Sequence, residues 1–241
     1  MSHFLHETVR SARAKYHAAY DIAEYATQRY SAAKRQLTPP GRPVFAVIDT
    51  ETTGFKKGTD RIIELAAVLL DDTFTEVGAW HTLINPGGKN ITNSSIHGIT
   101  NDLVAHAPQF EDIITDFASF IDNMVLIAHN APLDAKMLLG EINRFDSNDS
   151  IYLPFVDSIA LAKQELPTGP YKLSSLLQRL GVDNPRAHAA VDDAAATGAM
   201  LKALYTHRAR EVAHQILHQT HPFDARPVTN LGLAQAQRVT R

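Results

Sequence analysis

Acidic residues in the middle of the chain have the type and spacing that divalent cations require. Asp49 and Glu51 follow residues 44–48, a short apolar run with the composition of a buried strand. Because residues i and i+2 of a strand point to the same face, the two carboxylates should lie side by side. Like charges this close are costly unless a cation neutralises them, and Mg²⁺ and Mn²⁺ prefer oxygen ligands. Taken alone, the pair is more simply explained as two solvated acids at a strand end.

Two more aspartates lie at the starts of predicted helices. Asp134 follows another apolar run, residues 125–128, and falls in the first turn of a helix expected from residue 132. Asp193 lies near the start of a helix expected over residues 189–204. For each, a capping or first-turn role is an ordinary explanation, because carboxylates stabilise helix N-termini. The strength of the pattern is in the ordered set of four acids.

The hydrophobic pattern predicts the elements that position these side chains. A tight turn at Asp71 and Asp72 favours an antiparallel meander of the first three strands. Helices and strands then alternate, which indicates an α/β fold with a mixed five-stranded central sheet flanked by helices. The predicted strands are residues 44–48, 61–70, 74–84, 125–128 and 151–156, and the predicted helices are residues 108–122, 132–144, 157–165, 172–180 and 189–204, with short helical turns in 94–106.

Composition excludes several classes of protein. Of the 241 residues, 44% are apolar and 20% are charged, which is a globular composition. The absence of cysteine excludes disulfides, thiolate metal sites and cysteine nucleophiles. Residues 65–70 form the longest apolar run, too short to span a membrane, and the first residues lack the apolar segment of a secretory signal. We therefore expect a cytoplasmic protein.

The net charge of −3 hides an uneven distribution. Residues 1–42 carry +4, residues 43–205 carry −10 and residues 206–241 carry +3. An acidic middle either avoids polyanions or neutralises its carboxylates with cations, and the second explanation agrees with the four acids above. We expect the basic ends to supply part of the attraction to phosphates.

Three motifs in this order resemble the histidine-containing (DEDDh) branch of the DEDD superfamily of 3′–5′ exonucleases, which includes the proofreading epsilon subunits of bacterial replicative polymerases, ribonuclease T and oligoribonuclease. They are residues 49–54 (Asp-Thr-Glu-Thr-Thr-Gly), residues 129–134 (His-Asn-Ala-Pro-Leu-Asp), and His188 with Asp193 five positions later. Residues 95–100 also resemble a segment of epsilon-like members. The resemblance covers about residues 43–205 and implies a ribonuclease H-like fold. Leu133 departs from the pattern, because an aromatic residue usually precedes that aspartate.

The resemblance implies a two-metal phosphodiester hydrolase that uses Mg²⁺ or Mn²⁺. Asp49 would bridge both ions, Glu51 and Asp193 would complete the site of the ion beside the nucleophile, and Asp134 would support the second ion. His188 would act as the general base. Without the spacing to Asp193, this residue would be read as an ordinary surface-loop histidine.

Two further aspartates next to these motifs are assigned structural roles. Asp192 and Asp193 are adjacent on a helix and point about 100° apart, so only one of them can face the site. The spacing typical of the family selects Asp193, and we expect Asp192 to face solvent or to cap the helix. Asp157 follows the fifth strand, where it is expected to cap the next helix.

Contacts to the terminal nucleotide are expected near the first two motifs. Backbone and hydroxyl groups of Thr52 and Thr53 suit this role, and Gly54 permits close approach of the nucleotide to the backbone. The resemblance places His97 near the 3′-terminal sugar or phosphate. For His97, a bond to the backbone at a helix end is the structural alternative. The predicted contact residues are Thr52, Thr53, Gly54, His97 and Asn130, and Phe55 could stack on the strand end or serve a structural role.

The predicted function is a 3′–5′ exonuclease of the proofreading or repair type that releases nucleoside 5′-monophosphates from the 3′ ends of single-stranded DNA. The alternatives are an exoribonuclease that trims RNA or short oligonucleotides, and a non-catalytic nucleic-acid-binding subunit. The expected partners are single-stranded DNA or RNA 3′ ends and a DNA polymerase.

The chain divides into three predicted regions. Residues 1–42 are an N-terminal helical extension and a Pro-rich linker, 43–205 the exonuclease domain, and 206–241 a helix extension with a loose tail. Residues 7–37 have an alanine-rich heptad seam, which predicts either a homodimer through this helix or a helix lying along the domain surface.

Overall fold

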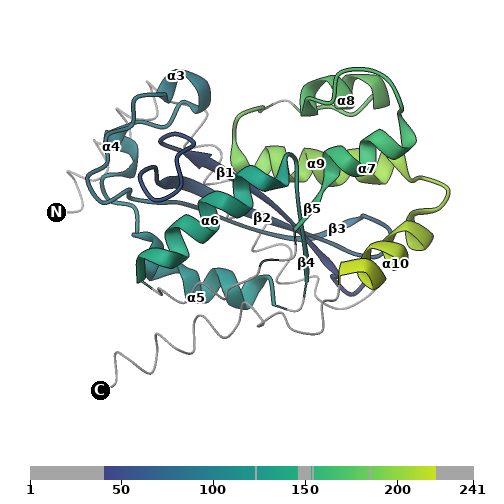
Figure 1. Ribbon diagram of the computed structural model, residues 1–241, viewed down its shortest axis with the longest axis horizontal. Coiled ribbons are helices and arrows are strands. Elements are labelled where there is room, and N and C mark those ends of the chain that lie inside the picture. The colour runs from purple at the N-terminus through teal and green to yellow at the C-terminus, as the bar shows by residue number, and fades with distance from the viewer. Residues whose placement is uncertain (1–40, 123, 146–152, 154, 185, 221–241) are drawn as a thin grey trace, which may run out of the picture.

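The computed structural model describes residues 41–122, 124–145, 153, 155–184 and 186–220. Its centre is a five-stranded sheet with the order β3-β2-β1-β4-β5 (Figure 1). The first three strands pair antiparallel and the last two join in parallel, so the sheet is mixed, as the sequence predicts. The strands are β1 Phe45–Thr52, β2 Ile62–Leu70, β3 Glu76–Leu83, β4 Val125–Ala128 and β5 Phe155–Asp157.

Strand β1 is longer than the apolar run that predicts it. Its pairing with β2 continues past Ile48 as far as Thr52, which lies opposite Ile62. Asp49 and Glu51 therefore belong to the strand, where the ladder with β2 holds a polar segment in extended form. The two carboxylates project from one face because of the two-residue period.

The helices agree with the predicted ranges to within a few residues, except at the C-terminal end. They are α3 Ser94–His97, α4 Asn101–Val104, α5 Phe110–Phe120, α6 Ala131–Phe145, α7 Ser158–Glu165, α8 Leu173–Leu180, α9 Ala190–Leu204 and α10 Ala209–Thr220. Within the part of the chain that the structure describes, no helix is both long and apolar enough to cross a bilayer. The predicted N-terminal helix, the linker as far as residue 40, and the tail from residue 221 lie outside the described residues.

Residues 208–218 were predicted to extend the last helix, but they form a separate one. Helix α9 ends at Leu204, and the Arg208 N–H donates to the carbonyl of Tyr205 in the turn that follows. Helix α10 then returns to the domain and buries Val212, Ala213 and Ile216 in its core. The segment is therefore packed against the domain as part of its core.

The sheet has a separate hydrophobic core on each face. Phe45 and Val47 of β1 belong to the core that contains α9 residues, whereas Ala46 and Ile48 belong to the core that contains α5 and α6 residues. Odd-numbered residues of β1 therefore face α9. Asp49 and Glu51 continue this odd series, which directs them toward the start of α9.

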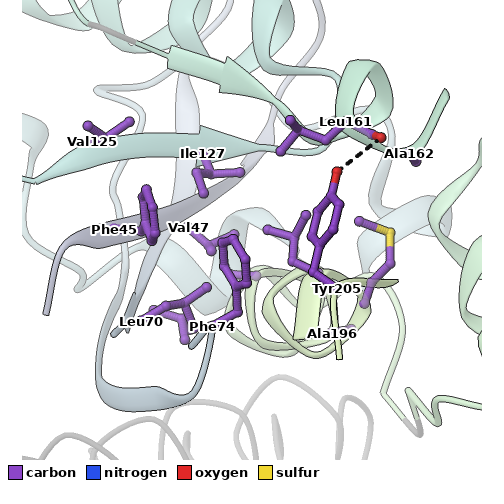
Figure 2. Close-up of a cluster of buried hydrophobic side chains, with 14 of the residues drawn as sticks. Phe45, Val47, Leu70, Phe74, Val125, Ile127, Leu161, Ala162, Ala196 and Tyr205 are labelled. Carbon is purple, nitrogen blue, oxygen red and sulfur yellow. Dashed lines mark hydrogen bonds between the residues drawn. The ribbon is translucent and has the colours of Figure 1, made fainter. Parts of the chain in front are cut away.

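An aromatic cluster closes the α9 face beside the β2–β3 turn (Figure 2). The Asp71 carboxylate organises the turn by accepting hydrogen bonds from backbone N–H groups of the following residues, and Phe74 adopts a left-handed backbone with φ of 56°. The Phe74 ring stacks on Phe45 at 5.4 Å and lies 5.8 Å from Tyr205. The Tyr205 hydroxyl donates to the Leu161 carbonyl at 3.2 Å.

We expect Tyr205→Phe to lower the free energy of unfolding by about 1 kcal/mol, because the buried Leu161 carbonyl loses this donor. Urea unfolding at neutral pH would measure the change. Tyr171→Phe is the matched control, since the half-buried Tyr171 hydroxyl donates to the Leu166 carbonyl in the same way and water can replace it. An equal or larger loss in the control would contradict the expected burial dependence.

Candidate metal centre

Three carboxylates from two elements converge at the end of β1. Asp49 and Glu51 project from the strand, and Asp193 projects from the first turn of α9. One oxygen of each lies within 4.8 Å of an oxygen of both others. The sequence grouped these three acids from motif order, and the structure brings them together because α9 begins above the odd-numbered face of β1.

Asp134 lies beside this group, near Asp49. It is buried in the first turn of α6 and accepts a hydrogen bond from the Thr50 hydroxyl at 2.7 Å. Its charge acts on Asp49, but it is not among the three acids whose oxygens lie within 4.8 Å of one another. The structure therefore separates the four predicted acids into a group of three and one neighbour.

Burial raises the pKa values of all four acids, and repulsion within the set adds to this effect for Asp49 and Glu51. Burial raises the pKa of Asp49 well above its usual range, with the charge of Asp134 the next cause. Burial, followed by the charge of Glu64, raises the pKa of Glu51 to about 9. Burial likewise raises the pKa of Asp134 to about 7 and raises that of Asp193. Buried acids that repel one another in this way fit divalent cations, which would neutralise them.

His188 is exposed beside this group and is tied to it through its backbone. Its φ of 70° is left-handed, and its N–H donates to Asp193 Oδ2 at 3.0 Å. The Asn184 amide donates to Asp193 Oδ1 at 2.6 Å. These three residues line a cavity of about 480 Å³, together with Lys172, residues of α8 and the loop that follows it. The five-residue spacing from His188 to Asp193 thus has a structural reason.

His97 lies on the other side of the site, at the end of α3. It is 6% exposed, and its Nδ1 accepts from the Ile99 N–H at 3.1 Å. Burial lowers the pKa of His97, and the nearby charge of Glu64 opposes that effect. Its buried Nε2 has no hydrogen-bond partner among the described residues. The same holds for Oδ1 of Asn93, whose amide nitrogen donates to the Thr52 carbonyl at 2.8 Å.

Two of the predicted contact residues, Thr53 and Gly54, stabilise the loop that follows β1. The Thr53 hydroxyl accepts from the Arg61 N–H at 3.0 Å and donates to Asp60 at 3.4 Å. Gly54 admits the Asp60 carboxylate, because a Cβ at this position would lie 2.5 Å from Asp60 Oδ2. The structure therefore gives Thr53 and Gly54 loop-forming contacts that the sequence did not predict.

Asn130, another predicted contact residue, lies in the turn between β4 and α6. It has φ of 73°, its side chain is exposed, and its N–H donates to Asp157 Oδ1 at 3.2 Å. Asp157 also accepts from the Ile159 N–H at 3.0 Å, so its predicted role as the cap of α7 is confirmed.

The expectation for Asp192 was wrong. It was predicted to face solvent or to cap α9, but it is buried and Ala189 occupies the cap position. Its Oδ1 accepts a hydrogen bond from Arg186 Nη2 at 3.1 Å. This ion pair compensates part of the cost of removing the carboxylate from water.

Two buried glutamates were missed by the sequence reasoning. Glu64 interrupts the otherwise apolar β2 strand and contacts the start of α9. Glu141 on α6 accepts from Arg61 Nε at 2.8 Å and from the Ile62 N–H at 2.9 Å. An acid inside a nine-residue buried strand is the signal that could have identified Glu64.

The chain is similar to a known protein family and to subunits of DNA polymerases. The model of the family described as Exonuclease matches residues 46–201. The DNA polymerase III epsilon subunit of Treponema pallidum is 34% identical over 182 residues, which cover 74% of this chain and 84% of that subunit. The PolC-type DNA polymerase III of Thermotoga petrophila is 37% identical over 154 residues, 64% of this chain. The chain spans only 11% of that polymerase.

A solved structure described as Exonuclease X in complex with 5′ overhanging duplex DNA has a similar fold. It is 26% identical with a TM-score of 0.57, and the match covers 72% of this chain and 99% of that one. The predicted ribonuclease H-like fold is confirmed by this likeness. The chain belongs to the exonuclease family and resembles its DEDDh members, including DNA polymerase III epsilon subunits.

Proposed function

We propose that this chain is a metal-dependent 3′–5′ exonuclease that hydrolyses single-stranded DNA from its 3′ end and releases nucleoside 5′-monophosphates. The observation that carries the proposal is the convergence of Asp49, Glu51 and Asp193 within 4.8 Å, with His188 held beside them. The epsilon subunit that matches most of the chain supports a proofreading role.

The acidic residues would hold two divalent cations, Mg²⁺ or Mn²⁺. Asp49, Glu51 and Asp193 would bind one of them, and Asp134 would support the other together with Asp49. When bound, the cations would stabilise charge on the attacking water and on the leaving 3′ oxygen. The raised pKa values of these acids support the assignment, because each carboxylate is costly to ionise in this site without a cation.

His188 is the general base in this proposal. Histidine commonly takes protons near neutral pH, and the exposed ring lies at the cavity that also contains Asp193. Its backbone N–H bond to the Asp193 carboxylate supports a position of this residue beside the proposed cation site, where the ring would accept a proton from the attacking water.

The terminal nucleotide would lie between β1 and α3. The unsatisfied His97 Nε2 and Asn93 Oδ1 are polar groups that the terminal sugar could satisfy. Two large apolar side chains of this region are exposed to solvent. Phe55, which follows β1, is 59% exposed, and Ile96 of α3 is 54% exposed. We assign them to contacts with the bases, since stacking on apolar and aromatic side chains is tolerant of sequence.

A DNA polymerase is the protein partner that the relatives favour. The matching protein from Treponema pallidum is named as a subunit of DNA polymerase III, and the PolC-type relative is itself a polymerase. We propose that the chain acts on 3′ ends that such a polymerase produces.

We expect time-resolved digestion of end-labelled oligonucleotides with Mg²⁺ or Mn²⁺ to reveal polarity and substrate class. A 5′-labelled DNA strand should give a ladder, a 3′-labelled strand should release labelled mononucleotide at once, and RNA should be cleaved more slowly than DNA. EDTA should stop the reaction. Faster cleavage of RNA would favour the exoribonuclease, release from the 5′ end would reject the polarity, and binding without cleavage would indicate a non-catalytic subunit.

A further inference from the structure

Glu64 is a buried carboxylate on the face of β2 that meets α9. It is 2% exposed, and Ala66 and Val68, which follow on the same face, belong to the core shared with α9. Its partner in the β1–β2 ladder is Glu51. Residues paired in an antiparallel ladder project to the same face, so the Glu64 side chain lies next to that of Glu51.

Two hydrogen bonds fix the Glu64 carboxylate. One oxygen lies 2.5 Å from His81 Nε2 of β3, and the other accepts from the Ala190 N–H at 3.2 Å. Ala190 is the first residue of α9, and the cap residue Ala189 has no side chain that could accept a hydrogen bond. Glu64 therefore caps α9 from a neighbouring strand, where a carboxylate also interacts favourably with the helix dipole.

We propose that Glu64, anchored by His81, is a positioning residue for the cation site. By binding the N–H of Ala190, it fixes the first turn of α9, which carries Asp193 three residues later. This contact sets the distance from Asp193 to the carboxylates of β1. The inference rests on the proposed function, because it assumes that these acids bind a divalent cation.

The position of Glu64 argues against a role in stability alone. Its carboxylate is buried on the same face of the sheet as that of Glu51, its partner in the β1–β2 ladder, and two acids placed in this way repel each other. In the metal-free protein this repulsion is a cost, which an apolar residue in the strand would not incur. The cost is offset when cations occupy the neighbouring site.

Glu141 provides a matched control. It is 1% exposed, and like Glu64 it contacts a basic side chain and a backbone N–H, here those of Arg61 and Ile62. It links α6 to the start of β2, and among the described residues its hydrogen bonds go to Arg61 and Ile62, not to α9. Removing either glutamate takes a partner from a basic side chain and from a buried N–H, but of the two only Glu64 hydrogen-bonds to the helix that carries Asp193.

The test is the affinity of the full chain for Mn²⁺, measured by titration calorimetry without substrate. Glu64→Ala should weaken binding about 10–100-fold, the usual effect of removing a group that orients a ligand. Glu64→Gln should stay within about threefold of wild type, because its amide oxygen can still accept the Ala190 N–H. Glu141→Ala should lower the melting temperature but change Mn²⁺ affinity less than about twofold.

Mn²⁺ binding by wild type and by Asp193→Asn tests the metal centre, whereas the Glu64 variants test the positioning role. If wild type fails to bind Mn²⁺, or Asp193→Asn binds it equally well, the proposed metal centre is wrong. If both behave as expected but Glu64→Ala binds like wild type, positioning by Glu64 is wrong. A Gln variant as weak as the Ala variant would also overturn it, since charge alone would then matter. Should Glu64→Ala not fold, His81→Ala must weaken Mn²⁺ binding, and unchanged affinity there rejects the inference.

Discussion

Asp49→Asn should abolish metal-dependent hydrolysis and at the same time make the metal-free protein more stable. Several kcal/mol of transition-state stabilisation depend on correctly held cations, so we expect the rate to fall at least about 10³-fold. Asparagine has nearly the same shape but no charge, so it removes the repulsion that Asp134, Asp193 and Glu51 exert on this buried position. The gain should be on the order of 1 kcal/mol or more, since one pKa unit corresponds to about 1.4 kcal/mol.

The stability of the metal-free protein should depend on pH. Glu51 has its pKa raised from 4.5 to about 9, so between these values the folded metal-free protein binds more protons than the unfolded chain. Its free energy of unfolding must therefore fall as pH rises through this range. Asp134, with a pKa of about 7, adds to the same slope. Adding Mn²⁺ should reverse the loss, and Asp49→Asn should flatten it.

Urea unfolding at pH 5, 7 and 9, with EDTA or with MnCl₂, would measure both effects. Asp71→Asn is the matched control, because Asp71 is also buried but its carboxylate organises the β2–β3 turn. That variant should retain activity and should not become more stable. A metal-free wild type that is more stable at pH 9 than at pH 5, or an Asp49→Asn variant that gains nothing, would contradict this account of the site.

His188→Ala should lower the turnover rate about 10²–10⁴-fold, the usual contribution of a positioned general base. The backbone N–H that binds Asp193 is kept in this variant, so Mn²⁺ affinity and KM should change much less than kcat. Single-turnover hydrolysis from pH 6 to 9 would measure the loss. Wild type should show a rise in rate with pH that the variant lacks.

The left-handed backbone of His188 calls for a second variant. Asparagine tolerates this conformation better than alanine and cannot act as the base, so His188→Asn separates the lost imidazole from backbone strain. Both variants should be similarly slow. If His188→Asn hydrolyses DNA at the wild-type rate and with the same pH profile, the general-base role is rejected.

The elements with simple apolar patterns could be predicted closely from the sequence. Strand β4 was expected at residues 125–128 and occupies Val125–Ala128. The start of α9 was placed within one residue, and this brought Asp193 to the correct end of the sheet. Motif order was sufficient to group Asp193 with Asp49 and Glu51, because all three lie where strands end or helices begin.

Other features depend on partners distant in the chain and have no local signature. Glu64 bonds to Ala190, 126 residues away, and Glu141 to Ile62, 79 residues away. The break before α10 contains neither proline nor glycine, so the helical pattern gave no reason to end α9 at Leu204. Asp192 was misplaced because helical spacing indicates that it points away from Asp193, but not that Arg186 pairs with it there.

The two hydrogen bonds to Asp193 have a consequence for the tolerance of this protein to insertions. Surface loops usually accept added residues, because few contacts depend on their length. Here the Asp193 carboxylate binds the Asn184 amide through Oδ1 and the His188 backbone N–H through Oδ2. Both bonds can form only if the number of residues between Asn184 and His188 stays the same. An inserted residue would break one of these bonds or turn His188 away from the site. The loop that leads to His188 should therefore tolerate changes in length as poorly as a buried strand does.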